Sequence, residues 1–412
     1  MPTRLPAATG GHTGGMTADP TFADLGEDAL VARILGRIPA APAVIVGPGD
    51  DAAVTESPGR LVSSADMLVE GEDFLPSWLD PHRLGIKAAA QNLADVRAMG
   101  ATPTGLLLSL AAPGTTPASF VDGLVDGLVE EAGRAGAVLL GGDLSDAGQI
   151  VIAVTALGAL PVDQPPLTRT AARPGHDVWL GGRTGWAAAG LDLLFADSAE
   201  AARARDADGP AADSPVSFAI EMQRAPRPAY AAVDALQNAL AAHADAVHSG
   251  AAHADPAAGT QAPAALIDLS DGLRSDAGRL ARASGAVIDL DGAALDSLAE
   301  DLLPVAQHVL ALEGDAAAAD SPDAVRTRAR SWVLHGGEDH GFLATVPEGV
   351  NPLGWRRVGR VRPAVDAPSA PVPDARSTAG RSVLIDGVPA EESGFAAVDP
   401  DGGYRHFSST GE

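Results

Sequence analysis

The sequence predicts a two-domain protein of the α/β (α+β) class. Short strand-like runs alternate with segments whose apolar residues recur at helical spacing, a pattern typical of this class. The chain has 412 residues, more than one ordinary hydrophobic core accommodates, so two domains are expected. Aromatic residues make up only 4% of the chain. The core is therefore expected to consist mainly of Ala, Val and Leu in close helix–sheet contacts.

The first domain is expected over residues 21–162. Asp80 followed by Pro81 predicts a helix start, with the carboxylate as N-cap and proline at the first helical position, and this helix is expected to end near Met99, before Gly100. Apolar residues recur at helical spacing over Ser119–Gly136, which predicts a second helix. Strands are expected at Ala43–Val46, Arg60–Ser64, Thr104–Ala111, Ala137–Leu140 and Ile150–Leu160.

The second domain is expected over residues 163–412, because Pro, Thr and Arg dominate the stretch between Leu160 and Pro174. Helices are expected from Trp186 onward and over Asp271–Ala283. Strands are expected at Asp177–Leu180, Ala264–Asp268 and Ala286–Leu290. Surface insertions, whose Ala, Asp, Gly and Pro content cannot bury a core, are expected near residues 197–214, 243–261 and 314–323. Residues 363–380 are expected to form a loop or linker.

The composition excludes several classes of function. The formal net charge is −26 at pH 7, and a field of this sign repels phosphodiesters and anionic headgroups, so neither nucleic acid nor a membrane is expected as a partner. An acidic protein that binds a nucleotide needs added positive charge, which a divalent metal ion supplies. The chain contains no cysteine, which excludes disulfides, thiolate zinc sites, iron–sulfur clusters and a cysteine nucleophile.

No targeting or membrane segment is expected. Residues 1–20 lack the apolar stretch of a signal peptide, and no segment approaches the run of about 20 apolar residues that spans a bilayer. We expect a cytoplasmic protein whose first 20 residues form a disordered extension.

A short apolar run followed by Gly or Ser and then by Asp recurs four times along the chain. Oxygen donors suit Mg²⁺, and glycine lets a phosphate approach the backbone. Each motif alone also fits a turn, and Asp271 alone fits a helix cap, but neither explanation accounts for Asp268. The pattern predicts a metal-dependent phosphate site formed by Gly47-Pro48-Gly49-Asp50-Asp51, Ser63-Ser64-Ala65-Asp66, Leu140-Gly141-Gly142-Asp143 and Asp268-Leu269-Ser270-Asp271-Gly272.

The first predicted helix carries polar residues on a face that is otherwise apolar. Gln91, Asn92 and Asp95 lie within about one turn of one another, among alanine, leucine and valine. Burying a carboxylate costs several kcal/mol unless a charge or hydrogen bonds compensate it. Asp95 is therefore either a site residue or a structural carboxylate that a cap or an arginine satisfies.

Taken in order, seven segments resemble the thiamine-monophosphate kinase family of the aminoimidazole ribonucleotide synthetase superfamily. They are GPGDDAAV, SSADMLVEGEDF, NLADVRAMGA, LLGGD, LTRTAARPG, IDLSDGLRSD and HGGED, and the resemblance spans roughly residues 22–408 apart from the insertions. It implies an N-terminal domain whose mixed sheet contributes to a dimer barrel, and a C-terminal α/β domain that closes over ATP. It also implies transfer of the γ-phosphoryl group of ATP to thiamine monophosphate, with several Mg²⁺ ions, in a homodimer.

The resemblance also implies roles for individual residues. It implies metal ligands at Asp50, Asp51, Ser64, Asp66, Asp95, Asp143, Asp268 and Asp271. It implies ATP contacts at Gly142, Asp143, Arg169 and Ser270, and substrate contacts at Asp73, Glu338 and Tyr404. Tyr404 would face the thiazolium or the pyrimidine ring, unless it packs against the core instead. No catalytic base beyond these ligands is implied, because the acceptor phosphate is already an anionic nucleophile.

Two departures from the family pattern concern the acceptor. Asp73 precedes Phe74 where the family commonly has His, so repulsion of an incoming phosphate is expected unless metal intervenes. His340 and Gly341 stand where Tyr-Glu is commoner. Both changes affect acceptor specificity more than ATP use.

Two alternative functions stay open from the sequence. One is an ATP-dependent ligase similar to aminoimidazole ribonucleotide synthetase. The other is a non-catalytic divalent-cation-binding protein, although no intact twelve-residue Ca²⁺ loop is present. His243, His248 and His253 are expected in a solvated loop and not in a metal site.

Overall fold

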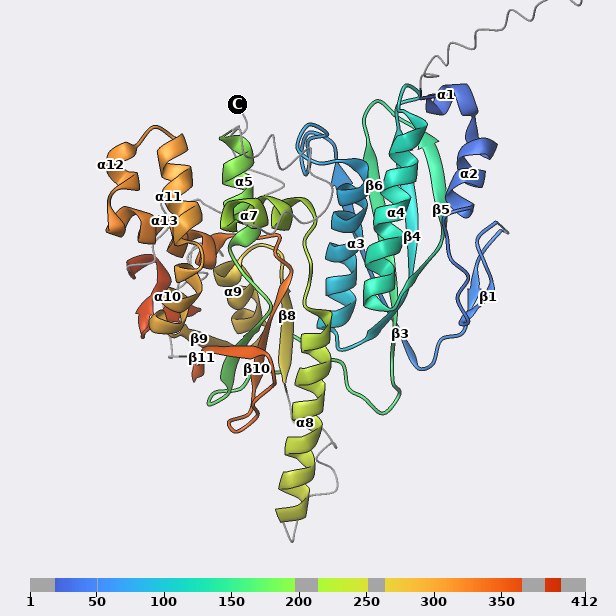
Figure 1. Cartoon of the computed structure of the whole chain (residues 1–412). Coiled ribbons are helices and arrows are strands. Elements are labelled where there is room, and N and C mark those ends of the chain that lie inside the picture. The colour runs from blue at the N-terminus through green and yellow to red at the C-terminus, as the bar shows by residue number, and fades with distance from the viewer. Residues whose placement is uncertain (1–18, 50, 197–213, 251–263, 365–381, 394–412) are drawn as a thin grey trace, which may run out of the picture.

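The computed structural model describes residues 19–49, 51–196, 214–250, 264–364 and 382–393. Two sheets dominate these residues and lie in separate parts of the molecule (Figure 1). The described part of the chain begins with the short helices α1 (Phe22–Leu25) and α2 (Glu27–Leu35). An antiparallel strand pair follows, β1 (Val44–Val46) with β2 (Val54–Thr55).

The first sheet has four strands in the order β3-β6-β4-β5. Its members are β3 (Arg60–Val69), β4 (Thr102–Ala112), β5 (Val138–Asp146) and β6 (Val151–Leu160). The β4–β5 pair is parallel, and β6 is antiparallel to both of its neighbours. The sheet is therefore mixed, as the family resemblance implied.

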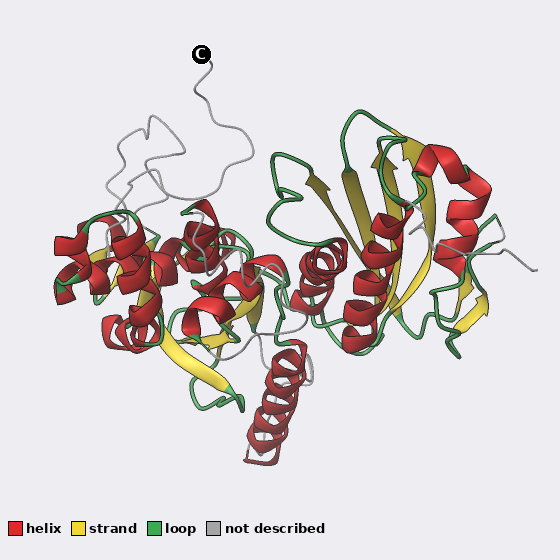
Figure 2. Cartoon of the chain, turned by 45° about the horizontal axis from the view of Figure 1, so that its top comes forward, coloured by secondary structure: helices red, strands yellow, loops and turns green. Residues whose placement is uncertain are grey.

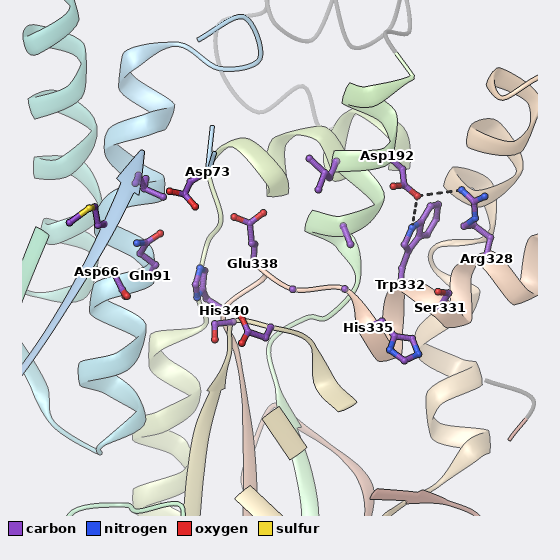
Figure 3. A pocket seen from close by; sticks show the side chains of 18 of the residues that line it. Asp66, Asp73, Gln91, Asp192, Arg328, Ser331, Trp332, His335, Glu338 and His340 are labelled. Atoms are coloured by element: carbon purple, nitrogen blue, oxygen red, sulfur yellow. Dashed lines mark hydrogen bonds and ion pairs between the residues drawn. The ribbon is translucent and has the colours of Figure 1, made fainter. Parts of the chain in front are cut away.

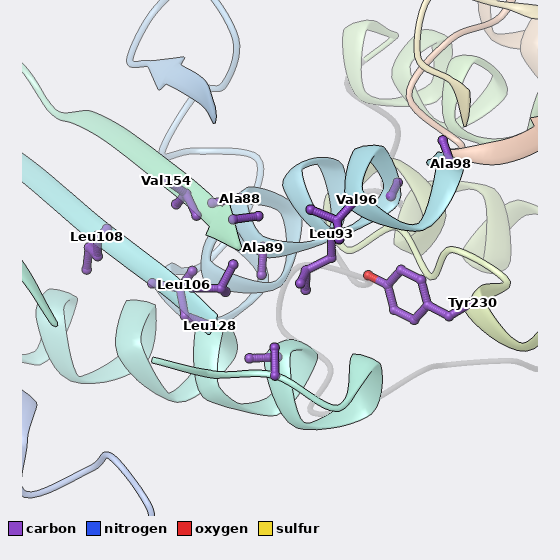
Figure 4. Close-up of a cluster of buried hydrophobic side chains, with 14 of the residues drawn as sticks. Ala88, Ala89, Leu93, Val96, Ala98, Leu106, Leu108, Leu128, Val154 and Tyr230 are labelled. Carbon is purple, nitrogen blue, oxygen red and sulfur yellow. The ribbon is translucent and has the colours of Figure 1, made fainter. Parts of the chain in front are cut away.

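Two helices, α3 (Pro81–Ala98) and α4 (Ala118–Ala135), pack against each other beside this sheet. Their backbones approach closely because both carry glycine where they touch. A Cβ atom at Gly127 would lie 1.9 Å from the carbonyl oxygen of His82, and one at Gly85 would lie 2.1 Å from that of Leu124. Figure 4 shows the resulting core, in which small alanines of α3 lie against leucines and valines of the strands.

The second sheet has seven strands in the order β13-β12-β9-β11-β7-β10-β8. They are β7 (Asp177–Gly181), β8 (Ala265–Leu269), β9 (Ala286–Leu290), β10 (Gly341–Val346), β11 (Trp355–Pro363), β12 (Val383–Ile385) and β13 (Val388–Pro389). Only the β12–β9 pair is parallel. A 3₁₀ turn, η2 (Ala390–Glu392), follows β13.

Helices accompany the second sheet, and Figure 2 shows the long α8 projecting from the middle of the molecule. Most of them enclose a core of their own with one face of the sheet. The helices are α5 (Trp186–Phe195), α7 (Pro215–Arg224), α8 (Tyr230–Gly250), α9 (Leu273–Ser284), α10 (Gly292–Glu300), α11 (Leu303–Leu312), α12 (Ala316–Ala319) and α13 (Pro322–His335). None of the described helices combines the length and apolar character that crossing a bilayer requires.

The other face of the second sheet packs toward the first part of the chain. Successive strand residues point to opposite faces, and Leu266 and Phe342 belong to the core that contains α3, whereas Ile267 and Leu343 belong to the core of the outer helices. Because Asp268 lies two residues after Leu266 and pairs with Phe342, it shares the face that meets α3. This register brings a carboxylate of β8 to the first part of the molecule.

Several local predictions are confirmed and others are wrong. Asp80 caps α3 by accepting a hydrogen bond from the Arg83 amide, with proline in the first turn, as predicted. Residues 314–323, predicted as a surface insertion, are mostly exposed and include the helix α12 and the start of α13, with Ala319 buried. His243 belongs to α8 and not to a loop, and α8 continues to Gly250. Residues 197–213, 251–263 and 365–381 lie outside the described part of the chain.

Candidate functional site

Carboxylates from both parts of the chain meet where α3 faces β8. Ser64 and Asp66 lie two residues apart on β3 and face α3: the Ser64 hydroxyl donates to Asp95 at 2.6 Å, and the Asp66 amide donates to the Asn92 side chain at 2.9 Å. Asp268 is only 4% exposed. Its electrostatic influence on Asp95 indicates that the two carboxyls are neighbours. The side chains of Asp66, Asp95 and Asp268 thus form one acidic cluster.

The negative charge of the acidic cluster is only partly compensated. Burial is the largest cause that raises the pKa of Asp95 to about 7, and the negative charge of Asp268 raises it further. The hydrogen bond from Ser64 acts in the opposite direction but does not offset these two effects. A histidine, His340, lies with Nδ1 3.6 Å from an Asp268 carboxylate oxygen. A cation at this place would favour the ionised carboxylates.

The cluster fits a metal ion that also binds substrate phosphates. Within the described residues, no three His, Asp or Glu side chains form a group able to hold an ion alone. Mg²⁺ commonly keeps several waters and binds through one or two carboxylates together with phosphate oxygens. Two carboxylates with an unfavourable like-charge interaction, such as Asp95 and Asp268, suit that mode of binding.

We predict that Mg²⁺ stabilises this protein more at pH 8 than at pH 5.5. The pKa of Asp95 is raised, so its contribution to stability is full below about pH 4 and is lost as the pH rises through about 7. Without Mg²⁺, the melting temperature should fall by about 1–2 °C between pH 5 and 8, which corresponds to roughly 1–2 kcal/mol for a chain of this size. Thermal unfolding with and without Mg²⁺ measures the difference.

The variant Asp95→Asn serves as the test of this assignment. It should lose the extra Mg²⁺ stabilisation at pH 8, because an amide does not titrate. Buried Asp276 and Asp339, whose pKa values burial also raises to about 7, should keep part of the metal-free pH dependence. An equal Mg²⁺ effect at both pH values would contradict the prediction.

The turn that carries Ser270 and Asp271 and the loop that carries Glu338 pack backbone against backbone. The amide of Glu338 donates to the carbonyl of Ser270 at 2.9 Å. A Cβ atom at Gly337 would lie 2.4 Å from that carbonyl oxygen, and one at Gly272 would lie 2.6 Å from the carbonyl oxygen of His335. Glycine is therefore required at both positions. This contact fixes the Ser270–Gly272 turn against the His335–His340 loop.

Asp271 lies in that turn but does not cap the following helix. The residue before α9 is Gly272, and α9 has no side-chain cap, so the helix-cap interpretation of Asp271 is wrong. Its carboxylate forms an ion pair with Arg279, and its amide donates to Asp276 at 3.0 Å. A metal ion at Asp271 would share the carboxylate with Arg279.

Glu338 lies at the joint between the two parts of the chain, meaning the interface where α3 meets α7 and the His335–His340 loop. It is held there as an anion. Lys87 Nζ lies 2.8 Å from one carboxylate oxygen, and the Gln223 amide donates to the other at 2.8 Å. Burial opposes ionisation of Glu338, but the charge and hydrogen bond of Lys87 outweigh it, so the pKa is lowered. The backbone of Glu338 is left-handed, with φ 67°, a conformation that non-glycine residues seldom adopt.

A cavity of about 610 Å³ joins these elements, a size typical of small-molecule sites. Figure 3 shows Asp66, Asp73 and Gln91 at one end, Glu338 and His340 in the middle, and Asp192, Arg328 and Trp332 at the other end. Asp73 accepts a hydrogen bond from the Val69 amide at 2.7 Å while it lines the wall. Ser270 and Asp271 also line this cavity.

Other predicted residues lie elsewhere. Asp51, Gly142 and Asp143 line a second cavity of about 660 Å³ beside β5. A row of residues paired in register crosses the sheet from β3 to β5: Asp66, Val154, Leu108 and Gly142. Three strand spacings, about 14 Å in all, therefore separate the two predicted groups. Within the described residues, one chain therefore does not bring Asp51 and Asp143 to the acidic cluster.

The predicted ATP contact Arg169 lies away from both cavities. Arg169 is exposed in the connection between β6 and β7, where its carbonyl accepts from Ser284 at 2.7 Å, and it lines neither cavity. Asp50 and Tyr404 lie outside the described residues.

Sequence reasoning missed Lys87 as part of the site, although a signal existed. Lys87, Gln91 and Asp95 are spaced by four residues and so lie along one face of α3. The contributions of Gln223, Asp192 and Trp332 had no comparable signal, because they depend on how α5, α7 and α13 pack.

The chain is similar to known proteins in sequence. The model of the AIR synthase related protein, N-terminal domain, matches residues 49–160. The thiamine-monophosphate kinase of Mycobacterium tuberculosis (strain ATCC 25618 / H37Rv) is 37% identical over 365 residues, which cover 88% of this chain and 92% of that protein. The thiamine-monophosphate kinase of Corynebacterium glutamicum is 36% identical over 346 residues, which cover 83% of this chain and 88% of that protein.

The fold is also similar to solved structures. AaThiL complexed with AMPPCP and TMP matches with a TM-score of 0.59 and 25% identity over 93% of this chain and 97% of that one. Hydrogenase maturation protein HypE in complex with ATP matches with a TM-score of 0.52 over 90% of this chain and 92% of that one. At 18% identity, the second likeness concerns the fold alone.

Proposed function

The chain belongs to the thiamine-monophosphate kinase family, and we infer from this premise that it phosphorylates thiamine monophosphate with ATP. The reaction transfers the γ-phosphoryl group to the acceptor phosphate and yields thiamine diphosphate and ADP. The likeness to AaThiL, solved with AMPPCP and TMP, supports both substrates. The enzyme is thus a kinase whose acceptor is a phosphate group.

One observation carries the proposal for the site: carboxylates of β3, α3 and β8 form one cluster, and Asp66 of this cluster lines one end of a cavity that both parts of the chain line. We propose that Asp66, Asp95 and Asp268, with Ser64, hold Mg²⁺ there, and that Asp271 contributes through its shared carboxylate. Further roles are proposals that rest on the family resemblance. They are metal or ATP binding by Asp50, Asp51, Gly142 and Asp143, ATP contacts by Arg169 and Ser270, and a substrate contact by Tyr404.

The protein's own residues mainly position the two anionic substrates. The acceptor phosphate is anionic at neutral pH, so the transfer requires in-line alignment and charge compensation more than a general base. Bound Mg²⁺ supplies the positive charge that lets the two phosphate groups approach. The acidic cluster fixes that charge, while Glu338, ionised and held by Lys87 and Gln223, faces the cavity where the cationic thiazolium would lie. Asp73 lies at the Asp66 end of the cavity (Figure 3), so bound Mg²⁺ has to offset its negative charge where the acceptor phosphate binds.

Release of ADP from Mg-ATP tests this function. The assay compares thiamine monophosphate, thiamine and formylglycinamidine ribonucleotide as acceptors. Rapid release is expected with thiamine monophosphate and little with thiamine, which lacks the acceptor phosphate. Release with the ribonucleotide alone would instead assign a ligase-type reaction and overturn the proposal.

We also propose that two chains associate through the open face of the four-stranded sheet. Strand residues paired in register share a face. Met67 and Leu107 lie on the face opposite most of the buried residues of β4 and β6, and Leu61 lies on the same face as Met67 near the end of β3, beside the buried Ala159. Leu61, Met67 and Leu107 are 67%, 54% and 38% exposed. A one-sided sheet that faces water is normally polar on that side, so this apolar face suits a partner sheet.

We predict that Leu61→Glu combined with Leu107→Glu yields monomers. In a symmetric interface each introduced carboxylate faces a low-dielectric, apolar surface and often its own copy, which is unfavourable. Sedimentation velocity measures the change. Val162→Glu is the matched control, since Val162 is also 67% exposed but lies beyond the end of β6. A wild-type monomer, or a dimer that persists in the double variant, would contradict the proposal.

The predicted division at residue 162 also stays a proposal. It is supported by the end of the first sheet at Leu160 and the start of the second at Asp177. A cytoplasmic location remains a prediction from the sequence.

A further inference from the structure

The end of the 610 Å³ cavity opposite the acidic cluster is a built corner with its own polar chemistry. Asp192 of α5 and Trp332 of α13 meet there (Figure 3). The Trp332 indole Nε1 donates to Asp192 Oδ2 at 2.9 Å, and Arg328 Nη1 donates to the same oxygen at 3.3 Å. Among the described residues, neither donor engages Asp192 Oδ1. One oxygen of a carboxylate that lines the cavity is thus left as an acceptor.

The charge of Asp192 is only partly compensated. Arg328 forms its shorter contacts with Glu313, at 2.9 and 3.0 Å through its two terminal nitrogens. Burial is the largest cause that raises the pKa of Asp192 above its usual value. A hydrogen-bond donor placed in the corner would therefore stabilise the ionised carboxylate.

The walls of the corner suit a flat ring. Ala188 and Leu191 of α5 supply an apolar wall, and the Ser331 hydroxyl and Trp332 line the α13 side. Trp332 itself is 5% exposed, so its ring is fixed by packing and by the bond to Asp192. The corner combines an apolar slot, a hydroxyl and a free carboxylate oxygen.

We propose that this corner binds the aminopyrimidine ring of the acceptor, with Asp192 Oδ1 accepting a hydrogen bond from the exocyclic amino group. This inference rests on thiamine monophosphate as acceptor. That molecule carries its phosphate at one end and its aminopyrimidine at the other, so a phosphate at the acidic cluster directs the ring toward the far wall. The amino group supplies the N–H donor that a free carboxylate oxygen matches, while the thiazolium between the two ends passes Glu338. Asp192 is thereby a specificity-determining residue.

The experiment compares thiamine monophosphate with oxythiamine monophosphate, in which an oxo group replaces the amino group. Wild-type kcat/KM should be at least about tenfold lower for the oxo compound, because a carboxylate then faces an acceptor. Asp192→Asn can present an amide N–H to the oxo group. It should lower kcat/KM for thiamine monophosphate about tenfold or more, chiefly through KM, and should remove or reverse the discrimination.

Asp296→Asn is the matched control. Asp296 is also a carboxylate paired to an arginine of α13, Arg330, at 2.5 Å, but it does not line the cavity. This control should leave KM and the discrimination unchanged. If Asp192→Asn unfolds, Asp192→Glu, which keeps the charge but moves it by one methylene, should raise KM and preserve the discrimination.

The outcomes separate this inference from the proposed function. Wild-type protein inactive on thiamine monophosphate would overturn both. Wild-type activity without discrimination between the two acceptors, or an Asp192→Asn variant that behaves like Asp296→Asn, would overturn the corner alone.

Discussion

Replacing Asp268 by Asn is expected to lower turnover by at least about 100-fold, equivalent to about 2.7 kcal/mol of transition-state stabilisation, and to change the melting temperature by no more than about 3 °C. The carboxylate is 4% exposed and belongs to the acidic cluster. Its removal takes away one of the anions proposed to hold Mg²⁺ between the two substrates, a contribution typically worth several kcal/mol. Stability changes little because relief of repulsion with Asp95 offsets loss of the contact with His340.

The next strand along the chain, β9, provides a matched control. β8 has the sequence Ala-Leu-Ile-Asp-Leu, and β9 has Ala-Val-Ile-Asp-Leu, so Asp289 occupies the equivalent position in β9. Asp289 forms an ion pair with Arg362 and accepts from the Gly387 amide at 2.9 Å. Asp289→Asn should therefore lower the melting temperature and leave kcat nearly unchanged.

Steady-state kinetics at saturating ATP and thiamine monophosphate, together with thermal unfolding in the absence of Mg²⁺, distinguish the two variants. Equal losses of kcat in Asp268→Asn and Asp289→Asn would assign Asp268 a structural role.

The sequence predicted what local chemistry determines. The limits of α3 were predictable because Asp80 and Pro81 at its start and Gly100 after its end act through their own backbone neighbours. The helix α12 within residues 314–323 was not predicted because its alanines carry no periodic signal, although Ala319 is buried against neighbouring helices. Arg60–Ser64 was too short for β3, which continues to Val69 through its pairing with β6.

Much of the site follows from packing that no local pattern reports. The family resemblance named Asp95 and Asp268, but their proximity depends on the register that turns Asp268 toward α3. The contacts of Lys87 with Glu338 and of Asp192 with Trp332 join residues 251 and 140 positions apart. Such pairs arise only when whole helices dock, so spacing within one segment does not reveal them.

The ion pair between Lys87 and Glu338 leads to the second large prediction. Lys87 has a side chain only 3% exposed, and its Nζ lies 2.8 Å from Glu338 and 3.1 Å from the carbonyl oxygen of Gln223. Lys87→Met leaves an anion in the joint without its cation. We expect a loss of about 2–3 kcal/mol, below the roughly 3–5 kcal/mol for fully buried pairs because the Glu338 side chain is 37% exposed.

The pH dependence of this stabilisation has a defined sign. The pKa of Glu338 is lowered, so the stabilisation is present above the ordinary glutamate pKa and is lost as the pH falls through the lower value in the folded protein. Chemical denaturation should therefore show a larger difference between wild type and Lys87→Met at pH 7 than at acid pH.

Lys87 is proposed as a positioning residue, and the kinetics should reflect that. Lys87→Met should raise KM for thiamine monophosphate by about tenfold or more, since Glu338 is no longer fixed opposite the thiazolium, while KM for ATP changes little. The double variant Lys87→Met with Glu338→Gln should regain much of the lost stability, because a neutral amide needs no buried cation, but should not regain the low KM.

The variant Arg83→Met distinguishes a specific role of Lys87 in orienting Glu338 from a general role in stabilising the joint. Arg83 lies one turn before Lys87 on α3 and forms an ion pair across the same joint with Glu221 at 2.9 Å, but it does not line the cavity. Its loss should lower stability and leave KM for thiamine monophosphate unchanged. If Arg83→Met and Lys87→Met raise KM equally, the joint as a whole controls acceptor binding, and Lys87 has no particular role in orienting Glu338.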